Sequence, residues 1–274
     1  MKKFLNIILV GIYFFLLTGC EEVILESEFV FEEKLVVRGI LDAGFALENI
    51  YVGKTLPVFA EYGDSYTHLT DAVVILRSGS TVVNLRHFRD GIYRAPEVTI
   101  QEGATYELIV YWNSLTANAI ISVPNAGSPG IAQIVNYSRP NNTLGKKIRA
   151  SVTPNGLEAY GATWAVLNVN DRVIIEAEEF DGVFRVQKGE QVLNLNIPTV
   201  EIPSSVYSSS ASSLGVVLYV YNTEYYDYFS TAGSGKLADA LFGQPSTSVI
   251  WNVKGDGIGM VAGRTRRIIR AQEE

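Results

Sequence analysis

The feature that most constrains the fold is a series of short runs rich in β-branched and aromatic residues, separated by turn-forming residues. Seven of these runs lie in the first half of the chain, at residues 34–41, 50–56, 72–77, 81–86, 92–95, 106–112 and 115–123. Ser78-Gly79-Ser80, Asp90-Gly91 and Asn113-Ser114 lie between runs and suit hairpin turns, because they tolerate positive φ or bond to the backbone. Short strands at this spacing predict a mainly β protein with an immunoglobulin- or fibronectin-like β-sandwich over residues 34–125.

The run at 106–112 supports the sandwich in more detail. Every second residue from Tyr106 to Trp112 is apolar, whereas the positions between them are mixed, so one face of this strand is expected to pack on a second sheet. The segment 102–106 resembles the corner of such sandwiches, where a tyrosine hydroxyl bonds to the chain upstream. Tyr106 is therefore expected to make that bond.

Residues 126–274 continue the pattern and are predicted to form a second β-rich domain with one or two short helices. Prolines and glycines at 123–130 indicate a linker, which places the boundary near residue 126. The expected strands are 131–137, 147–153, 163–169, 172–177, 183–186, 192–197 and 214–221. Asn222-Thr223-Glu224 predicts a helix start before 225–232, a second helix is expected at 236–242, and the serine-rich segment 204–213 is expected to be a flexible loop. The chain is expected to end with a run at 248–253, a turn at 254–257 and two strands at 258–262 and 265–269.

Residues 1–19 have the layout of a lipoprotein signal peptide. Lys2 and Lys3 form a positive n-region, and the apolar run at 4–17 is too short to span a bilayer. Leu17-Thr18-Gly19-Cys20 resembles a lipobox, in which the Cys20 thiol accepts a diacylglyceryl group with acyl chains such as palmitate and Cys20 becomes the first mature residue. Because the sequence has 1 cysteine, this modification would leave no thiol for a disulfide, a metal site or a nucleophile. The alternative is an ordinary exported protein with a free thiol.

Residues 20–33 are predicted to form an acidic tether. The segment contains Glu21, Glu22, Glu26, Glu28, Glu32 and Glu33. It resembles the acidic export signal that sends some Bacteroidota-type lipoproteins to the outer face of the outer membrane; the alternative is a solvated spacer whose charges keep it extended. Without the signal peptide, Lys plus Arg falls from 22 to 20 against 29 Asp plus Glu, so the mature net charge is −9. This charge argues against nucleic acid as a partner.

Two groups of side chains are candidates for a binding surface. Tyr225, Tyr226 and Tyr228 would lie on the predicted helix, where they either form an aromatic platform for sugar or peptide or pack into the core. The basic C-terminal segment contributes Arg264, Arg266 and Arg267. These residues either dock an acidic partner or lipopolysaccharide phosphate, or form a solvated strand face.

The sequence offers little material for catalysis. His68 and His87 have no second good ligand nearby in the sequence, so neither a zinc site nor a Ser-His-Asp triad is expected. Glu178 and Glu179 are neighbours, and neighbouring strand residues point to opposite faces, which argues against a carboxylate pair. The glycine-rich segment 255–259 lacks the lysine and the helix of a phosphate loop and is expected to be a hairpin turn. We therefore expect no enzymatic activity, no cofactor and no metal.

The order of these features is similar to that of a known family. From the lipobox through the strand at 34–37, the Tyr106 strand and the linker, the chain resembles the family called domain of unknown function 4249. Residues 219–228 resemble its strand leading into a short tyrosine-rich helix, and residues 251–259 resemble its closing Asn-and-Gly motif, although residues 260–263 depart from the usual form. The resemblance implies a Bacteroidota-type cell-envelope lipoprotein, often associated with TonB-dependent outer-membrane receptors, with no assigned activity and no catalytic residues.

These observations favour a binding function over catalysis. The first hypothesis is an outer-membrane lipoprotein that acts as a binding or accessory module beside a TonB-dependent receptor. The sequence leaves open whether it lies on the cell surface or on the periplasmic face of the membrane. The alternative is a free-standing cell-surface adhesin or a glycan- or peptide-binding protein. A hydrolase ranks third, because no pair of nucleophile and base is evident.

Overall fold

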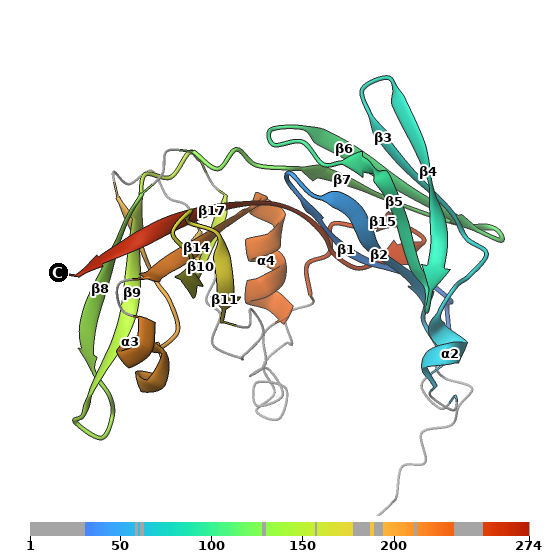
Figure 1. The fold of residues 1–274 in the computed structure, drawn as a ribbon. Helices are drawn as coiled ribbons and strands as arrows, with labels where there is room; N and C mark the ends of the chain where they lie inside the picture. The colour runs from blue at the N-terminus through green and yellow to red at the C-terminus, as the bar shows by residue number, and fades with distance from the viewer. Residues whose placement is uncertain are drawn as a thin grey trace, which may run out of the picture. The chain divides into compact units, whose positions relative to one another are not determined.

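The computed structural model describes residues 31–57, 60, 63–127, 130–156, 158–177, 187–188, 194–210, 213–232 and 249–273. The elements reported below belong to one compact unit, Glu33–Glu274. Most of the described residues lie in strands, which hydrogen bonds join into one extended network (Figure 1). The predicted mainly β class is therefore confirmed. No helix in the described ranges is long and apolar enough to cross a membrane.

The first half of the chain contains all seven predicted strands. They are β1 (Leu35–Asp42), β2 (Ala46–Lys54), β3 (Val73–Ser78), β4 (Thr81–Arg89), β5 (Ile92–Thr99), β6 (Thr105–Trp112) and β7 (Leu115–Ser122), with the short helix α2 (Asp64–Thr67) after β2. The antiparallel pairings run in the order β1–β2–β5–β4–β3–β6–β7. Because alternate side chains point inward, Leu35, Val37, Ile50, Val52 and Leu108 are buried in one hydrophobic cluster. Each such side chain contributes about 1.5–3 kcal/mol when it is fully buried.

The turns and the tyrosine corner have the expected local structure. Asp90 and Gly91 have φ angles of 47° and 71°, and Asn113 has a φ of 50°, as tight hairpins require. The Tyr106 hydroxyl accepts a hydrogen bond of 2.8 Å from the backbone N–H of Gln101, so the predicted bond is confirmed. The immunoglobulin-like type of this region stays a prediction.

The second half is built around strands buried on both faces. Its elements are β8 (Ile131–Ser138), β9 (Leu144–Val152), β10 (Ala159–Leu167), β11 (Val173–Glu176), β12 (Gln187–Lys188), β13 (Leu195–Pro198), α3 (Ser204–Ser210), β14 (Leu214–Tyr221), α4 (Thr223–Ala232), β15 (Lys254–Gly255), β16 (Gly257–Ile258) and β17 (Val261–Glu273). Every residue of β14 is buried, since alternate residues face two further hydrophobic clusters. The second hydrophobic cluster contains Leu214, Val216, Leu218 and Val220, and the third contains Val217, Tyr219 and Tyr221. A strand covered on both faces is expected to be apolar throughout rather than alternating.

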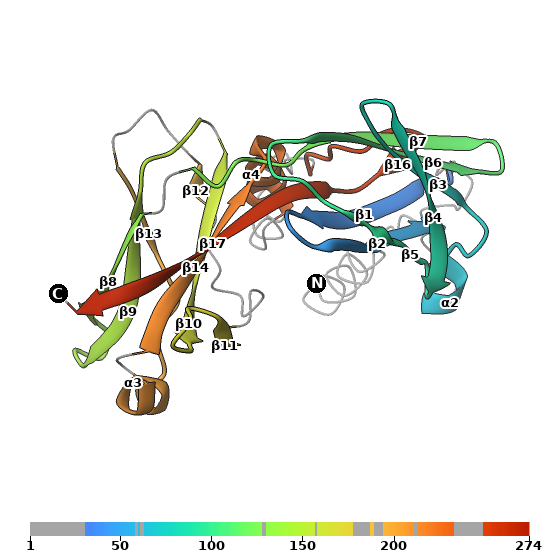
Figure 2. The same cartoon turned by 45° about the horizontal axis from the view of Figure 1, so that its top comes forward.

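Strand β17 connects the two halves of the network (Figures 1 and 2). Its first residues pair in parallel with β1, where Val261 lies opposite Gly39. Its middle pairs antiparallel with β14, and its last residues pair in parallel with β8. The domain boundary near residue 126 stays a prediction, because β17 pairs with β1, which precedes residue 126, and with β8 and β14, which follow it.

Two predictions about the second half are wrong. The serine-rich segment expected to be a loop contains α3, where the Ser208 and Ser209 hydroxyls donate hydrogen bonds to the carbonyls of Ser204 and Ser205. Val206 and Tyr207 pack on the second hydrophobic cluster and provide the apolar contact that holds this helix. The two expected final strands are one strand of 13 residues, β17, preceded by the short β15 and β16, and residues 249–253 form no strand. The predicted strand at 183–186 and helix at 236–242 lie outside the described residues.

Candidate functional site

A buried asparagine fixes the start of helix α4. Asn222 follows β14, and its side-chain Oδ1 accepts a hydrogen bond of 3.0 Å from the backbone N–H of Gly263. The backbone N–H of Asn222 in turn donates to the carbonyl of Gly263 at 3.0 Å. The side-chain Nδ2 donates to Glu224 at 2.8 Å. Asn222 therefore ties the first turn of α4 to β17.

A second asparagine performs the same task for the segment before β15. Asn252 Nδ2 donates to the carbonyl of Val261 at 2.7 Å, and Asn252 Oδ1 accepts from the N–H of Val261 at 2.9 Å. The N–H of Ile250 donates to the hydroxyl of Thr231 near the end of α4. Residues 250–252 are thereby held between α4 and the start of β17.

The glycines that follow Asn252 allow strands to approach closely. Gly259 has a φ of 132°, and a Cβ atom there would collide with the carbonyl oxygen of Val37. Gly255 has a φ of 82°, and its Cβ would lie 2.5 Å from the carbonyl oxygen of Thr116. These positions need glycine for backbone geometry. The segment 255–259 is thus a pair of short strands around Asp256, with a structural function.

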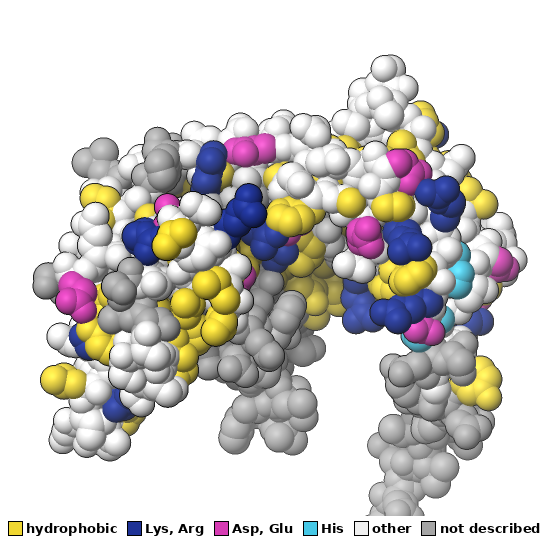
Figure 3. Space-filling view, in the orientation of Figure 1, with side chains coloured by type: hydrophobic (Ala, Val, Ile, Leu, Met, Phe, Trp, Pro, Cys, Tyr) yellow, Lys and Arg dark blue, Asp and Glu magenta, His cyan; other side chains and the backbone are white. Residues whose placement is uncertain are grey.

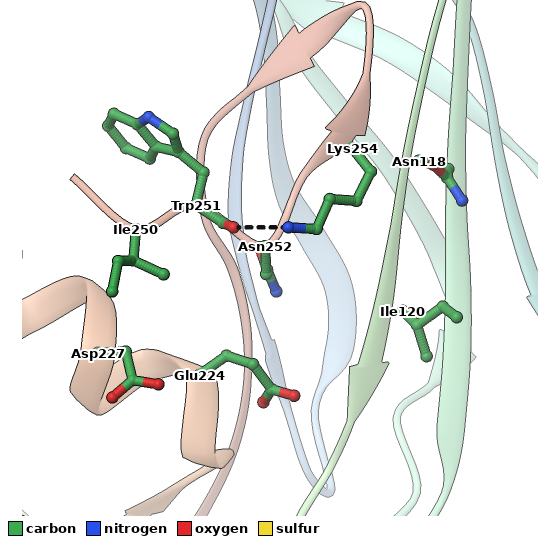
Figure 4. A pocket seen from close by; sticks show the side chains of 8 residues that line it. All are labelled: Asn118, Ile120, Glu224, Asp227, Ile250, Trp251, Asn252 and Lys254. Carbon is green, nitrogen blue, oxygen red and sulfur yellow. Dashed lines mark hydrogen bonds between the residues drawn. The ribbon is translucent and has the colours of Figure 1, made fainter. Parts of the chain in front are cut away.

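These constraints form a hollow between α4 and β7, with a volume of about 320 Å³ (Figure 4). We call it the α4–β7 hollow. Its lining residues come from three chain segments: Asn118 and Ile120 from β7, Glu224 and Asp227 from α4, and Ile250, Trp251, Asn252 and Lys254 from the segment leading into β15. The two asparagines described above position the helix and the loop, and the pairing of β7 with β15 positions the strand, so the walls belong to the hydrogen-bonded framework.

The α4–β7 hollow combines exposed apolar groups with opposite charges. Ile120 and Ile250 are 65% and 49% exposed, although their side chains are apolar. Glu224 extends from α4 toward Ile120 in Figure 4. Lys254 supplies the positive charge and lies 3.4 Å from the carbonyl oxygen of Trp251. This lining of apolar side chains beside charges of both signs suits recognition of a ligand or a protein segment.

The tyrosines predicted as a possible platform face the protein instead. Tyr225, Tyr226 and Tyr228 are partly buried and pack against the third hydrophobic cluster. The Tyr225 ring stacks on the buried Tyr221 ring with centroids 4.1 Å apart. Tyr228 lies 5.5 Å, ring to ring, from Trp251. Of the three tyrosines, Tyr228 thus has a ring contact with a residue of the α4–β7 hollow.

The three candidate arginines do not come together as one surface. Arg264 forms an ion pair of 2.9 Å with Asp42 and lies over the ring of Tyr219. Arg266 stacks on Phe45, with its guanidinium carbon 3.9 Å from the ring centroid. Arg267 points to the other face of β17 and lies 3.5 Å from Glu102. None of the three lines the α4–β7 hollow.

The remaining polar candidates are also dispersed. His68 lies against the ring of Tyr51, and His87 lies against the ring of Tyr93. Glu178 and Glu179, like Cys20, lie outside the described residues. Within the described ranges, no group of three or more His, Cys, Asp or Glu side chains is placed to hold a metal ion.

Sequence reasoning missed most of the residues that line the α4–β7 hollow. Ile120 occupies an exposed position of β7, which an alternating strand usually fills with a polar residue. Trp251 and Asn252 stand directly before the glycine-rich segment. These features were the signals in the sequence. The lining residues come together, however, through pairings across more than a hundred residues, such as that of Asn118 with Lys254.

Fold and site together define a mainly β protein with a hollow whose walls belong to the hydrogen-bonded framework. The chain belongs to the family described as Domain of unknown function (DUF4249), whose family model matches residues 21–267. This match confirms the resemblance inferred from the sequence. Neither a comparison with curated proteins nor one with solved structures gave a match to this chain.

Proposed function

We propose that this protein is a lipid-anchored outer-membrane lipoprotein that acts as a binding or accessory module for a TonB-dependent receptor. The observation that carries the binding function is the α4–β7 hollow, where Ile120 and Ile250 are exposed beside charges of both signs. Exposed apolar side chains around a concave surface are typical of sites that bind a partner. The receptor is proposed from the family resemblance.

The lipid anchor is supported by the lipobox residues Leu17-Thr18-Gly19-Cys20. Several acyl chains are needed for stable attachment, because each buried CH₂ contributes about 0.8 kcal/mol. Mass spectrometry of the mature N-terminal peptide from purified envelopes tests this step. An acylated Cys20 would support it, whereas an intact signal peptide or a free thiol would contradict it.

Recovery of a receptor with the lipoprotein tests the accessory function. We expect affinity purification from detergent-solubilised envelopes to recover a TonB-dependent receptor with the tagged full-length chain. Ile120→Asp places a charge in the α4–β7 hollow and should abolish recovery. Ile131→Asp is the matched control, because Ile131 is 62% exposed on β8, away from the hollow. Recovery without any β-barrel receptor, or equal loss in both variants, would contradict the proposal.

The alternative function is a free-standing adhesin or a glycan- or peptide-binding protein. It is supported by Trp251, which lines the hollow and extends the aromatic contact with Tyr228. Binding to glycan arrays and to matrix proteins distinguishes it from the receptor hypothesis. Retention that disappears in Trp251→Ala would favour this function, and no retention on either support would exclude it.

Proteinase digestion of intact cells tests on which side of the outer membrane the protein lies. Digestion from outside would support surface display, and complete protection would indicate the periplasmic face.

A further inference from the structure

The outer face of the sheet formed by β1, β2, β5 and β4 carries cations and aromatic rings. On β1 and β2, Arg38 is paired with Tyr51, and its guanidinium carbon lies 4.6 Å from the ring centroid. On β4 and β5, Arg94 lies 3.7 Å from the ring centroid of Phe88, which is 47% exposed. Figure 3 shows basic side chains gathered around apolar ones over β2, β4 and β5. We call this surface the basic face.

The positive charge of the basic face is only partly compensated. Its cations are Arg38, Arg86, Arg89 and Arg94, whereas the side chain of Lys54 lies on the opposite side of β2, with its Nζ 5.2 Å from the ring centroid of Trp112. Ion pairs join Arg86 to Glu97 and Arg94 to Glu48. Within the described part of the chain, neither Arg38 nor Arg89 lies within ion-pair distance of a carboxylate. Such a surplus is notable in a protein with a formal net charge of −7.

The register of β4 and β5 increases the electrostatic cost of this arrangement. Arg86 lies directly opposite Arg94 across the two strands. Like charges at directly opposed positions of an antiparallel pair destabilise the sheet. The ion pairs with Glu97 and Glu48 offset part of this repulsion, and an anion bound at this face would offset more of it.

The face also contains a hollow of suitable size and lining. A cavity of about 480 Å³ is lined by Arg38 and Lys54 together with Val36, Tyr51, Leu56 and Thr67, among others. Two cations beside apolar and aromatic groups can accommodate an anionic headgroup above an apolar contact. Protein surfaces that lie at a membrane interface typically combine cations with aromatic rings.

We infer that the basic face binds the anionic phospholipid headgroups of a membrane surface. This inference rests on the proposed lipid anchor, because the tether enters the folded unit beside the face. The last tether residue, Glu33, forms an ion pair of 2.9 Å with Lys54. Residues 20–33 span at most about 50 Å when fully extended, at ~3.3–3.6 Å per residue, so an anchored Cys20 keeps the face within reach of the bilayer.

Vesicle cosedimentation tests the inference without the lipid anchor or the receptor. The probe is the mature chain, residues 20–274, with Cys20→Ser, mixed with vesicles of phosphatidylcholine alone or with added phosphatidylglycerol. We expect binding only to the vesicles with phosphatidylglycerol, and weaker binding at high salt. Because the chain is not acylated, failure here would leave the anchor and the receptor hypothesis standing.

Charge reversal identifies the surface that binds. The double variant Arg38→Glu/Arg94→Glu should lower the partition coefficient by about 25-fold or more, since each cation held at an anionic surface contributes about fivefold. The control Arg77→Glu/Arg267→Glu makes the same change in net charge at side chains that are 45% and 43% exposed elsewhere, and should retain binding. The milder Arg38→Gln/Arg89→Gln replaces the first variant if circular dichroism shows that it does not fold. No binding to anionic vesicles, or equal losses in test and control variants, would overturn the inference.

Discussion

Asn252 clamps the start of β17 through its side-chain hydrogen bonds to Val261, and replacing it gives the sharpest test of how the α4–β7 hollow is built. Asn252→Ala removes both side-chain hydrogen bonds to the backbone of Val261, at 2.7 and 2.9 Å. Val261 is fully buried, so its N–H and carbonyl lose their partners away from bulk solvent. An orphaned buried polar group costs about 1–3 kcal/mol. Because Asn252 itself is only partly buried, water can reach part of the gap, and we expect a total loss of about 2–4 kcal/mol.

The assay is urea unfolding of the mature Cys20→Ser protein followed by tryptophan fluorescence. In a thermal scan, the same loss corresponds to a decrease in Tm of about 4–16 °C for a domain of this size. Asn118→Ala is the matched control, because Asn118 lines the same hollow but its side chain makes no hydrogen bond within the described residues. This control should change the free energy of unfolding by less than about 0.5 kcal/mol.

Asn252→Asp separates the donor from the acceptor. The carboxylate keeps an oxygen for the N–H of Val261 but places a second oxygen where Nδ2 now donates to the Val261 carbonyl. We expect this variant to be at least as destabilised as Asn252→Ala at neutral pH. Its stability should recover relative to wild type below about pH 4, where the carboxyl group regains a proton to donate. Equal unfolding midpoints for Asn252→Ala and Asn118→Ala would refute the clamp.

Two further predictions concern the second half of the chain. Tyr160→Phe removes the hydroxyl that accepts a 3.1 Å hydrogen bond from the N–H of Asn155. This variant should lower the free energy of unfolding by about 1 kcal/mol in urea titrations. No change would show that this hydrogen bond does not stabilise the fold. Hydrogen bonds, first from Arg139 and then from Tyr137, lower the pKa of Glu201 from 4.5 to about 2. The folded-state pKa is lowered, so this stabilisation is present above about pH 4.5 and disappears as the pH falls toward 2. The difference in Tm between wild type and Glu201→Gln should therefore shrink over that range, and a constant difference would contradict the assignment.

The first half of the fold was predictable because its signals are local. Strand alternation and turn residues such as Asp90-Gly91 act over a few residues, and they gave all seven strands. The Tyr106 corner was recognised for the same reason. The equivalent bond of Tyr160, also to an N–H five residues upstream, was missed although it lies at the same position in its strand. Asn155-Gly156 before it was the available signal.

Elements that depend on distant contacts were harder to predict. Helix α3 has a serine-rich sequence with weak helix preference, and Val206 and Tyr207 become informative only when the cluster they cover is known. The length of β17 depends on its successive partners β1, β14 and β8. The α4–β7 hollow was unpredictable for the same reason, because its three walls are separated in sequence and meet only through these pairings.

The residues that carry the family resemblance explain the fold more than the activity. Asn222 and Asn252 both bind the backbone of β17, at Gly263 and Val261, and the glycines between 255 and 259 allow strands to approach. A motif with these functions positions α4 and the segment 250–254 without specifying what they bind. Under the proposed binding function, selectivity then resides in side chains that the framework leaves exposed, such as Ile120 and Lys254. Under the same proposal, variants of the lining residues should therefore change binding without unfolding the protein.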